Sequence, residues 1–246
     1  MTPRRPRDIR PTDVFIRWAF GDGEPPGLVA DGANAAWLGR ASRPGELWIT
    51  GMGDDPAVVA GLVERLDGEH HVDGVTVTED AFGHLTERLR SPAPGHWCYW
   101  VLDPAGVELE PTIAVPLAMD DPRIGPLLEH SDSAYTFPGN PRMVRWAGVV
   151  EGGDLPCVAG QVRDPSGAAH LVSVCTHPSA RGRGLARQAC VAIMRAAIAD
   201  GAPMIVLEMY VANEPGRRLY SSLGFTEVGR FLSGLLAHAL PPADTA

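Results

Sequence analysis

Lysine is missing from this sequence, since all 21 basic residues are arginine. Its absence excludes the nucleotide-binding pattern Gly-x-x-x-x-Gly-Lys, because the lysine of that pattern contacts the phosphate groups. The dinucleotide-binding pattern Gly-x-Gly-x-x-Gly does not occur either. The sequence therefore favours neither of these two kinds of nucleotide-binding fold.

Cysteine is scarce, and none of the four residues has the spacing of a metal site or a redox motif. Cys157, Cys175 and Cys190 lie within apolar runs, where free cysteine behaves as a small buried hydrophobic residue. We therefore expect a reducing compartment and no bound metal.

Long apolar runs are missing as well. No stretch of 18 apolar residues occurs, so we expect no membrane-spanning helix. Arg4, Arg5 and Arg7 are not followed by the apolar segment of a secretory signal peptide. Together these absences predict a soluble, cytoplasmic protein with no membrane partner.

Positive charge is too scarce for a nucleic-acid-binding surface. The net charge is −9, and residues 1–119 carry 10 arginines against 18 acidic residues, a net of −8. Residues 120–246 carry 11 arginines against 12 acidic residues, a net of −1. Because non-specific binding to nucleic acid needs the opposite sign, we exclude nucleic acid as a partner.

The length of 246 residues allows one large domain or two smaller ones. Strand and helix patterns alternate throughout, which predicts an α/β fold. We expect a boundary between two domains within residues 111–121. The chain then divides into a second, smaller α/β domain in residues 1–119 and a larger one in residues 120–246.

The first part mixes short strand patterns with turns. Residues 14–19 and 47–50 have the composition of strands, and the glycine- and proline-rich residues 21–45 have that of turns. A capped helix is expected to begin at Asp54 or Asp55, just before Pro56. Further elements expected here are a strand at 75–77, a helix capped by Thr78 and carrying Phe82, Leu85 and Leu89, and a strand at 97–102.

The second part has clearer patterns. A hairpin is expected through Glu151-Gly152-Gly153-Asp154, and a third strand pairs with it through the turn at residues 164–167. The order that follows is helix, strand, helix, strand, which predicts a mixed sheet flanked by helices. The expected elements are a helix at 124–130, strands at 143–150, 155–162 and 168–176, a helix at 183–199, a strand at 205–210, a helix at 215–223 and a strand at 226–232.

The stretch from His170 to Ala186 carries the strongest functional signal. A strand runs into a loop with Gly182 and Gly184, and the loop opens a long helix. Glycine lets backbone N–H groups approach a ligand, and a helix start adds unpaired N–H groups and a positive dipole end. The pattern predicts an anion site suited to a pyrophosphate, with positive charge added by Arg181, Arg183 and Arg187.

Two motifs in this part resemble those of the GNAT N-acetyltransferase superfamily. Arg181, Gly184 and Ala186 match its pattern of Arg or Gln, two residues, Gly, one residue, then Gly or Ala. Downstream, Asn213 and the run Leu-Tyr-Ser-Ser-Leu-Gly-Phe at 219–225 match its second motif. One departure is a glycine at position 216, where the family more often has alanine. The resemblance covers about half of the chain.

The resemblance implies how a cosubstrate binds. Acetyl-CoA would lie in a V-shaped gap between the strands 170–176 and 205–210, in a splayed sheet. The pantetheine arm would bond to backbone groups near the end of the first strand, and Asn213 would help to hold it. The pyrophosphate would sit on the amides of the glycine loop. The cosubstrate-binding residues implied in this way are Val174, Cys175, Thr176, Arg181, Gly182, Arg183, Gly184, Leu185, Ala186 and Asn213.

The resemblance also implies catalytic roles. Tyr220 would point at the thioester sulfur and protonate the departing thiolate, and a backbone N–H near Val174 would stabilise the oxyanion. The base that deprotonates the amine is open between two residues. His170 stands at the offset of a glutamate found in the histone-acetylating branch, and Glu208 lies on the facing strand.

Three functions remain open. The first is transfer of an acetyl group to a primary amine of a small molecule by direct attack, without a covalent acyl-enzyme. The second is acetylation of a protein or peptide, and the third is a non-catalytic acyl-CoA sensor, against which the intact Tyr220 argues. Residues 1–119 are either a degenerate second GNAT-like unit, which we prefer, or an unrelated α/β domain that walls the acceptor pocket. A homodimer is possible.

Overall fold

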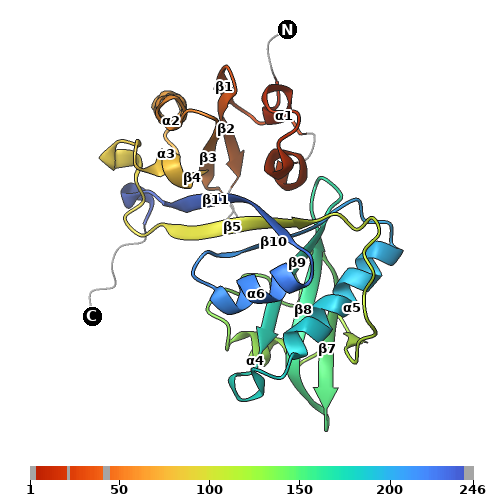
Figure 1. The fold of residues 1–246 in the computed structure, drawn as a ribbon. Helices are drawn as coiled ribbons and strands as arrows, with labels where there is room; N and C mark the ends of the chain where they lie inside the picture. The colour runs from red at the N-terminus through yellow and green to blue at the C-terminus, as the bar shows by residue number, and fades with distance from the viewer. Residues whose placement is uncertain (1–3, 21–22, 41–44, 241–246) are drawn as a thin grey trace, which may run out of the picture. The chain divides into compact units, whose positions relative to one another are not determined.

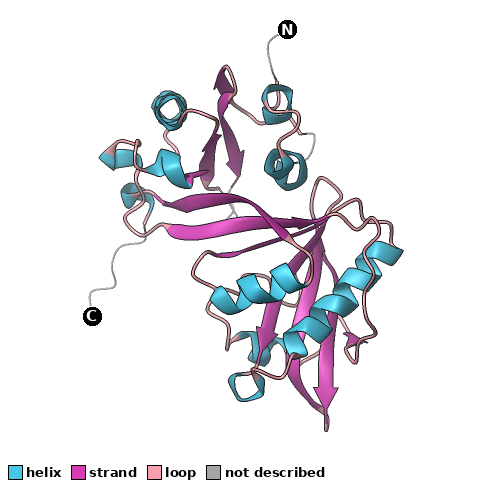
Figure 2. Ribbon diagram, viewed as in Figure 1, coloured by secondary structure: helices cyan, strands magenta, loops and turns pink. Residues whose placement is uncertain are grey.

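The computed structural model describes residues 4–20, 23–40 and 45–240, with Arg40 described by its backbone only. Strands and helices alternate along these residues, as predicted (Figures 1 and 2). The strands are β1 (Leu28–Asp31), β2 (Asn34–Arg40), β3 (Leu47–Met52), β4 (Gly74–Thr78), β5 (Gly95–Leu102), β6 (Val115–Leu117), β7 (Met143–Glu151), β8 (Asp154–Arg163), β9 (Ala169–Thr176), β10 (Ile205–Tyr210) and β11 (Thr226–Leu235). The α-helices are α1 (Pro6–Ile9), α2 (Pro56–His70), α3 (Glu79–Phe82), α4 (Ile124–Leu128), α5 (Leu185–Ala199) and α6 (Glu214–Ser222).

The chain forms two compact units that exchange segments along the sequence. Unit 1 comprises Met1–Cys98, Tyr210–Ala212 and Gly229–Ala246, and unit 2 comprises Tyr99–Met209 and Asn213–Val228. This division differs from the single boundary expected at 119/120. The reason is that β5 begins in unit 1 and ends in unit 2, whereas β11 begins in unit 2 and ends in unit 1.

Unit 1 contains a mixed sheet covered by α2. Strands β1, β2 and β3 pair in antiparallel order, β4 runs parallel to β3, and β11 runs antiparallel to β4. The core between sheet and helix is aliphatic, with Ile49, Val59 and Val75 fully buried. Asp55 caps α2 as predicted, since its carboxylate accepts from the backbone N–H groups of Ala57 and Val58 at 3.0 and 3.2 Å.

Unit 2 repeats much of this order. Strands β6 to β9 pair in antiparallel order, and β10 runs parallel to β9. Helix α5 connects β9 to β10 and packs on β7, β8 and β9, and Figure 1 shows α5 and α6 side by side in front of these strands. The short helix α4 packs on β8 and β9. Its residues Ile124, Leu127 and Leu128 join a second buried cluster with Trp146.

Two predictions for the first part were wrong. Residues 14–19 were expected to form a strand, but Ile16–Phe20 form a π-helix, because a short apolar run does not distinguish the two by periodicity. Residues 21–45 were expected to be turns, yet β1 and β2 lie there; residues 21–22 and 41–44 are outside the described chain. The predicted turns are found at Gly32, whose φ of 57° forms the turn of this hairpin, and at Gly45, whose φ is 92°.

The helix expected after Thr78 is also shorter than predicted. Helix α3 ends at Phe82, and Leu85 lies outside it. The Thr78 side chain makes no capping hydrogen bond. Leu85 and Leu89 are nevertheless buried, so the apolar pattern marked core residues correctly but not their secondary structure.

Candidate active site

The strands β9 and β10 separate along their length. Their pairing covers only Ala169 with Ile205 and His170 with Val206, although the strands have 8 and 6 residues. Burial follows the same change, because the first four residues of β9 are buried whereas Ser173, Val174 and Thr176 are half-buried. This geometry matches the V-shaped gap that the family resemblance implies.

A bulge in β9 lies beside the widening gap. The pairing with β8 shifts between Val158 and Gly160, so Ser173 and Val174 together face a single residue of β8. Ser173 has a φ of 51°, and its hydroxyl donates to the carbonyl of Thr136 at 2.7 Å. A bulge turns backbone groups out of the ladder, so the amides near Val174 are available to a ligand, as expected for an oxyanion donor.

The glycine loop needs its two glycines for their backbone conformation. Gly182 and Gly184 have φ values of 78° and 76°, in the left-handed region, and a Cβ at either position would meet open space. Gly184 is the N-terminal boundary of α5. The first amides of α5, from Leu185 onward, have no partners within the helix, which leaves them for an anion.

The three arginines of the loop differ in what they contact. Arg181 donates to the carbonyls of Thr176 at 3.3 Å and His130 at 3.5 Å. Arg183 forms a two-point ion pair with Glu151, at 2.7 and 3.0 Å, so much of its charge is neutralised.

Arg187 connects α5 to α6. Its guanidinium donates to the carbonyl and the hydroxyl of Ser222, at 3.3 and 3.0 Å. Neither of these partners is charged. Of the three arginines expected to add positive charge, Arg181 and Arg187 therefore keep theirs.

Tyr220 is buried, with 8% of its side chain exposed, and its ring meets that of Phe225 edge-on at 5.9 Å. Loss of solvation, with a smaller effect of the Cys190 and Cys157 thiols, raises the pKa of Tyr220 well above its ordinary value. The hydroxyl therefore stays protonated at neutral pH, the state that a general acid requires.

Tyr220 and the two candidate bases belong to opposite faces of the sheet. Cys157 and Val158 are consecutive on β8, so their side chains point to opposite faces. Cys157 lies near Cys190 of α5, whereas Val158 packs in the α4 cluster. The face that carries Cys157 is therefore the α5 face, and Tyr220, with its Cys157 and Cys190 neighbours, belongs to it.

His170 and Glu208 share the other face, that of α4. His170 pairs with Val162, which has the same orientation as Val158, and across the sheet with Val206. Glu208 follows Val206 by two residues and points the same way. A thioester in the gap could thus meet Tyr220 from one face and an amine from the other.

His170 is buried and bound to a carboxylate. Its Nδ1 lies 3.3 and 3.2 Å from the two oxygens of Asp164, and its buried Nε2 has no hydrogen-bond partner within the described chain. Burial alone lowers the pKa of His170, but the Asp164 hydrogen bond and the charge of Glu208 raise it above its ordinary value. Asp164 also pairs with Arg142 at 2.6 Å.

Glu208 differs from His170 because its side chain is exposed. Surrounding protein nevertheless removes enough solvation to raise the pKa of Glu208, an effect that His170 and Arg142 oppose and Asp164 reinforces. The described residues include no ion-pair partner of Glu208 within 4.0 Å. Of the two candidate bases, Glu208 is the one that a solute can reach in this conformation.

Asn213 has a structural contact of its own. Its side-chain oxygen accepts from the backbone N–H of Gly216 at 3.0 Å and caps α6. A Cβ at Gly216 would lie 2.7 Å from the Asn213 side chain. The glycine at this position, where the family more often has alanine, therefore accommodates the cap.

Cys175 and Thr176, at the end of β9, also contact other protein groups. The Cys175 thiol donates to the carbonyl of Leu127 at 3.3 Å, and the Thr176 hydroxyl donates to the sulfur of Cys157 at 3.2 Å. All four cysteines are buried and free, as predicted for core residues. For Cys175 and Thr176, only backbone groups are left for a cosubstrate.

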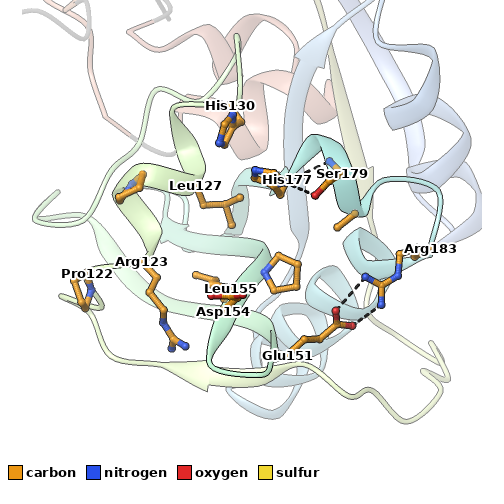
Figure 3. Close-up of a pocket in the computed structure, with 13 residues that line it drawn as sticks. Pro122, Arg123, Leu127, His130, Glu151, Asp154, Leu155, His177, Ser179 and Arg183 are labelled. Carbon is orange, nitrogen blue, oxygen red and sulfur yellow. Dashed lines mark hydrogen bonds and ion pairs between the residues drawn. The ribbon is translucent and has the colours of Figure 1, made fainter.

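A pocket of about 670 Å³ lies between α4, the β7–β8 turn and the glycine loop (Figure 3). Figure 3 shows the ion pair of Arg183 with Glu151 and the bond of His177 to Ser179 on its wall. The pocket contains none of the three predicted catalytic residues. Its lining residues are Pro122, Arg123, Pro126, Leu127, His130, Glu151, Asp154, Leu155, Pro156, His177, Ser179, Ala180 and Arg183.

Sequence reasoning missed the partners of the candidate bases. Asp164 was interpreted only as a turn residue, and its backbone does form the turn with Gly167 and Ala168. Arg142 and Tyr135 were not singled out. The available signal was Asp164, a charged residue at the start of a turn and six positions before His170. No local pattern distinguishes such a residue from a solvent-exposed turn residue.

Two kinds of site are not found in the described ranges, 4–20, 23–40 and 45–240. No group of three or more His, Cys, Asp or Glu side chains in them could hold a metal ion. No helix in them is long and apolar enough to cross a membrane.

Comparisons with known proteins agree with the fold and the motifs. The acetyltransferase (GNAT) family matches residues 115–225, ending at the phenylalanine of the second motif. A comparison with curated protein sequences found no match to the chain.

Solved structures show the same fold at low identity. A protein of Novosphingobium aromaticivorans, described as a GNAT-family acetyltransferase, is 22% identical over 85% of this chain and 89% of its own, with a TM-score of 0.56. A GCN5-related N-acetyltransferase of Kribbella flavida is 14% identical over 94% and 93%, also with a TM-score of 0.56. One from Sphaerobacter thermophilus is 14% identical over 87% and 78%, with a TM-score of 0.55. The solved structures agree in fold, and the family match identifies residues 115–225 as an acetyltransferase domain of the GNAT superfamily, whose members generally use acetyl-CoA as cosubstrate.

Proposed function

We propose that this protein is an N-acetyltransferase that transfers the acetyl group of acetyl-CoA to a primary amine of a small molecule by direct attack. The observation that carries the proposal is the position of Tyr220 and the two candidate bases on opposite faces of the sheet, beside the gap between β9 and β10. Donor and acceptor can then meet in one complex, which makes a covalent acyl-enzyme unnecessary.

The chain's own residues fit the cosubstrate. The two glycines with positive φ leave open space at the start of α5, and the free amides there suit a pyrophosphate. The backbone at Val174 and Thr176, both half-buried, suits the amide-rich pantetheine arm. When bound, acetyl-CoA supplies the thioester, and the amide near Val174 stabilises the oxyanion as the amine attacks.

The face that carries the candidate bases favours a cationic acceptor. Asp164 is paired with both Arg142 and His170, whereas Glu208 has no ion-pair partner within the part of the chain that the structure describes. An ammonium group would supply one. A protein acceptor remains the second candidate, because proteins also present primary amines.

The test is the release of CoA thiol from acetyl-CoA across a library of amines, with wild-type protein and Tyr220→Phe. We expect Tyr220→Phe to lower kcat by about 10–100-fold, at the low end for a general acid, because a thiol with a pKa of about 8.5 leaves readily. CoA affinity should be nearly unchanged, since the buried ring remains.

Two results would contradict this proposal. If no amine, free or in a peptide, releases thiol, the protein is not an N-acetyltransferase. If Tyr220→Phe retains full activity, the hydroxyl is not the acid and the residue only fills the core.

A further inference from the structure

The face of the sheet that carries the candidate bases, here called the acceptor face, presents the buried Asp164–His170 pair and the exposed Glu208. The two candidate bases differ in access: His170 is 6% exposed and its Nε2 is covered, whereas the side chain of Glu208 is open to solvent. A general base must lie within hydrogen-bond reach of the proton that it removes. Of the two, Glu208 is the one whose side chain a solute can reach in this conformation.

His170 nevertheless has a defined orientation. Because an ionised carboxylate only accepts hydrogen bonds, Asp164 holds the proton of the imidazole on Nδ1. Nε2 is buried without a hydrogen-bond partner within the described chain, a state that costs free energy. Besides Asp164, the charge of Glu208 acts on His170 and raises its pKa.

Three charged groups outside β10 act on Glu208. Asp164 follows β8, His170 is the second residue of β9 and Arg142 precedes β7. Besides burial, the charge of Glu208 also raises the pKa of two tyrosine hydroxyls, those of Tyr99 on β5 and Tyr135 in the loop after α4. Tyr135 is 60% exposed, so its ring is available to the body of an acceptor.

Resting on the proposed function, we propose that Glu208 binds the acceptor's ammonium group and takes its proton, and that the acceptor is a primary amine with no carboxylate beside it. Glu208 attracts an ammonium and repels a neighbouring carboxylate, and Arg142 does not offset its charge because Arg142 is paired with Asp164. Free amino acids are therefore poor acceptors, and their amides are good ones.

The proton and electron transfers balance. The ammonium gives one proton to Glu208, and the neutral amine forms a C–N bond to the thioester carbon. The C–S bond then breaks, the sulfur takes the Tyr220 proton, and Tyr220 regains a proton from the nitrogen of the adduct. The products are the amide, CoA thiol and the proton left on Glu208, which passes to solvent.

The first experiment compares matched acceptors, phenylalaninamide with phenylalanine and glycinamide with glycine, at equal concentrations of free amine. Wild-type kcat/KM should favour the amide by at least about tenfold, because like charges placed side by side repel strongly. Glu208→Gln should lower kcat/KM for the amide by about 10²–10³-fold. It should also reduce the ratio of kcat/KM for the amide to that for the free amino acid. Equal use of acid and amide, or an unimpaired Glu208→Gln protein, would overturn the proposal.

The second experiment follows the acidic limb of kcat/KM against pH in three variants. Asp164 raises and Arg142 lowers the pKa of Glu208, so Asp164→Asn should move the limb to lower pH and Arg142→Gln to higher pH. Both variants break the same ion pair, so a merely structural effect would move them in the same direction and would overturn the proposal. His170→Gln removes a neighbouring positive charge, so its limb should move to higher pH while activity above the limb is retained.

Loss of activity at every pH in His170→Gln would make His170 the base and overturn the assignment to Glu208. Calorimetry with CoA reports whether each variant is folded, since none of these side chains belongs to the glycine loop. The two proposals fail differently. Absence of thiol release from every amine defeats the proposed function itself, whereas activity with unaltered pH limbs defeats only this inference.

Discussion

At the scale of the residue, Gly184 and Gly106 form a matched pair. Both belong to unit 2, both have a positive φ, of 76° and 73°, and a Cβ at either would meet open space. The left-handed conformation costs an L-residue about 1–2 kcal/mol, and more for a β-branched one. Valine at either position should therefore lower the free energy of unfolding by a similar amount.

Only the change at Gly184 should affect CoA. Gly184→Val displaces the amides at the start of α5, each of which contributes about 1.5–3 kcal/mol to a charged ligand. We expect CoA affinity to fall at least tenfold, for which about 1.4 kcal/mol suffices, and to be unchanged in Gly106→Val. Calorimetry and thermal unfolding measure both effects. Equal affinities in the two variants would show that the loop is only a turn.

The residues of the glycine loop and Tyr220 could be predicted because their signals are local. A positive φ requires glycine, and the motif fixes its distance from the arginine and from the helix. Asp164 and Arg142 could not be predicted in the same way, because Asp164 meets His170 and Arg142 only after β7, β8 and β9 have paired. The relative access of His170 and Glu208 likewise depends on tertiary burial, which no sequence pattern contains.

At the scale of the element, the two units share one order. β1, β2, β3, α2 and β4 in unit 1 correspond to β7, β8, β9, α5 and β10 in unit 2, with the same antiparallel and parallel pairings. Both connecting helices have 15 residues. This correspondence supports the interpretation of the first part as a degenerate second GNAT-like unit.

Unit 1 differs where a cosubstrate would bind. β3 and β4 stay paired from Trp48 with Gly74 to Gly51 with Val77, so no gap opens between them. The carboxylate of Asp55 occupies the first amides of α2 and would repel a pyrophosphate. The described residues 53–55, between β3 and α2, thus include no glycine with a positive φ and no counterpart of the glycine loop.

We therefore predict one CoA site per chain. Calorimetric titration of the full chain should give a stoichiometry near one, and Gly184→Val should remove all of the binding. Asp55→Ala serves as the control: losing the cap should cost about 1 kcal/mol of stability without changing CoA affinity. Two equivalent sites, or residual tight binding in Gly184→Val, would mean that unit 1 binds CoA as well.

At the scale of the whole molecule, the boundary was the hardest feature to predict. Composition changes little across residues 111–121, and the two exchanges of segments leave no local signal. The pairing of β4 with β11 joins residues 74–78 to 231–235, far apart in the sequence. Patterns of short range reveal strands but not their partners, so the elements of the second part were predicted closely and the division of the chain was not.

The exchange of segments makes a specific prediction about cutting the chain at 119/120. A fragment of residues 120–246 lacks β6, and its residues Phe231–Leu235 lose their pairing partners on β4. A fragment of residues 1–119 contains β4, but one edge of that strand is unpaired. Unpaired strand edges promote aggregation. Each fragment should therefore be insoluble or lack a cooperative thermal transition, and co-expression of the two should restore CoA binding by letting β4 and β11 pair. A fragment 120–246 that unfolds cooperatively and binds CoA as the full chain does would establish that the second part is an independent domain.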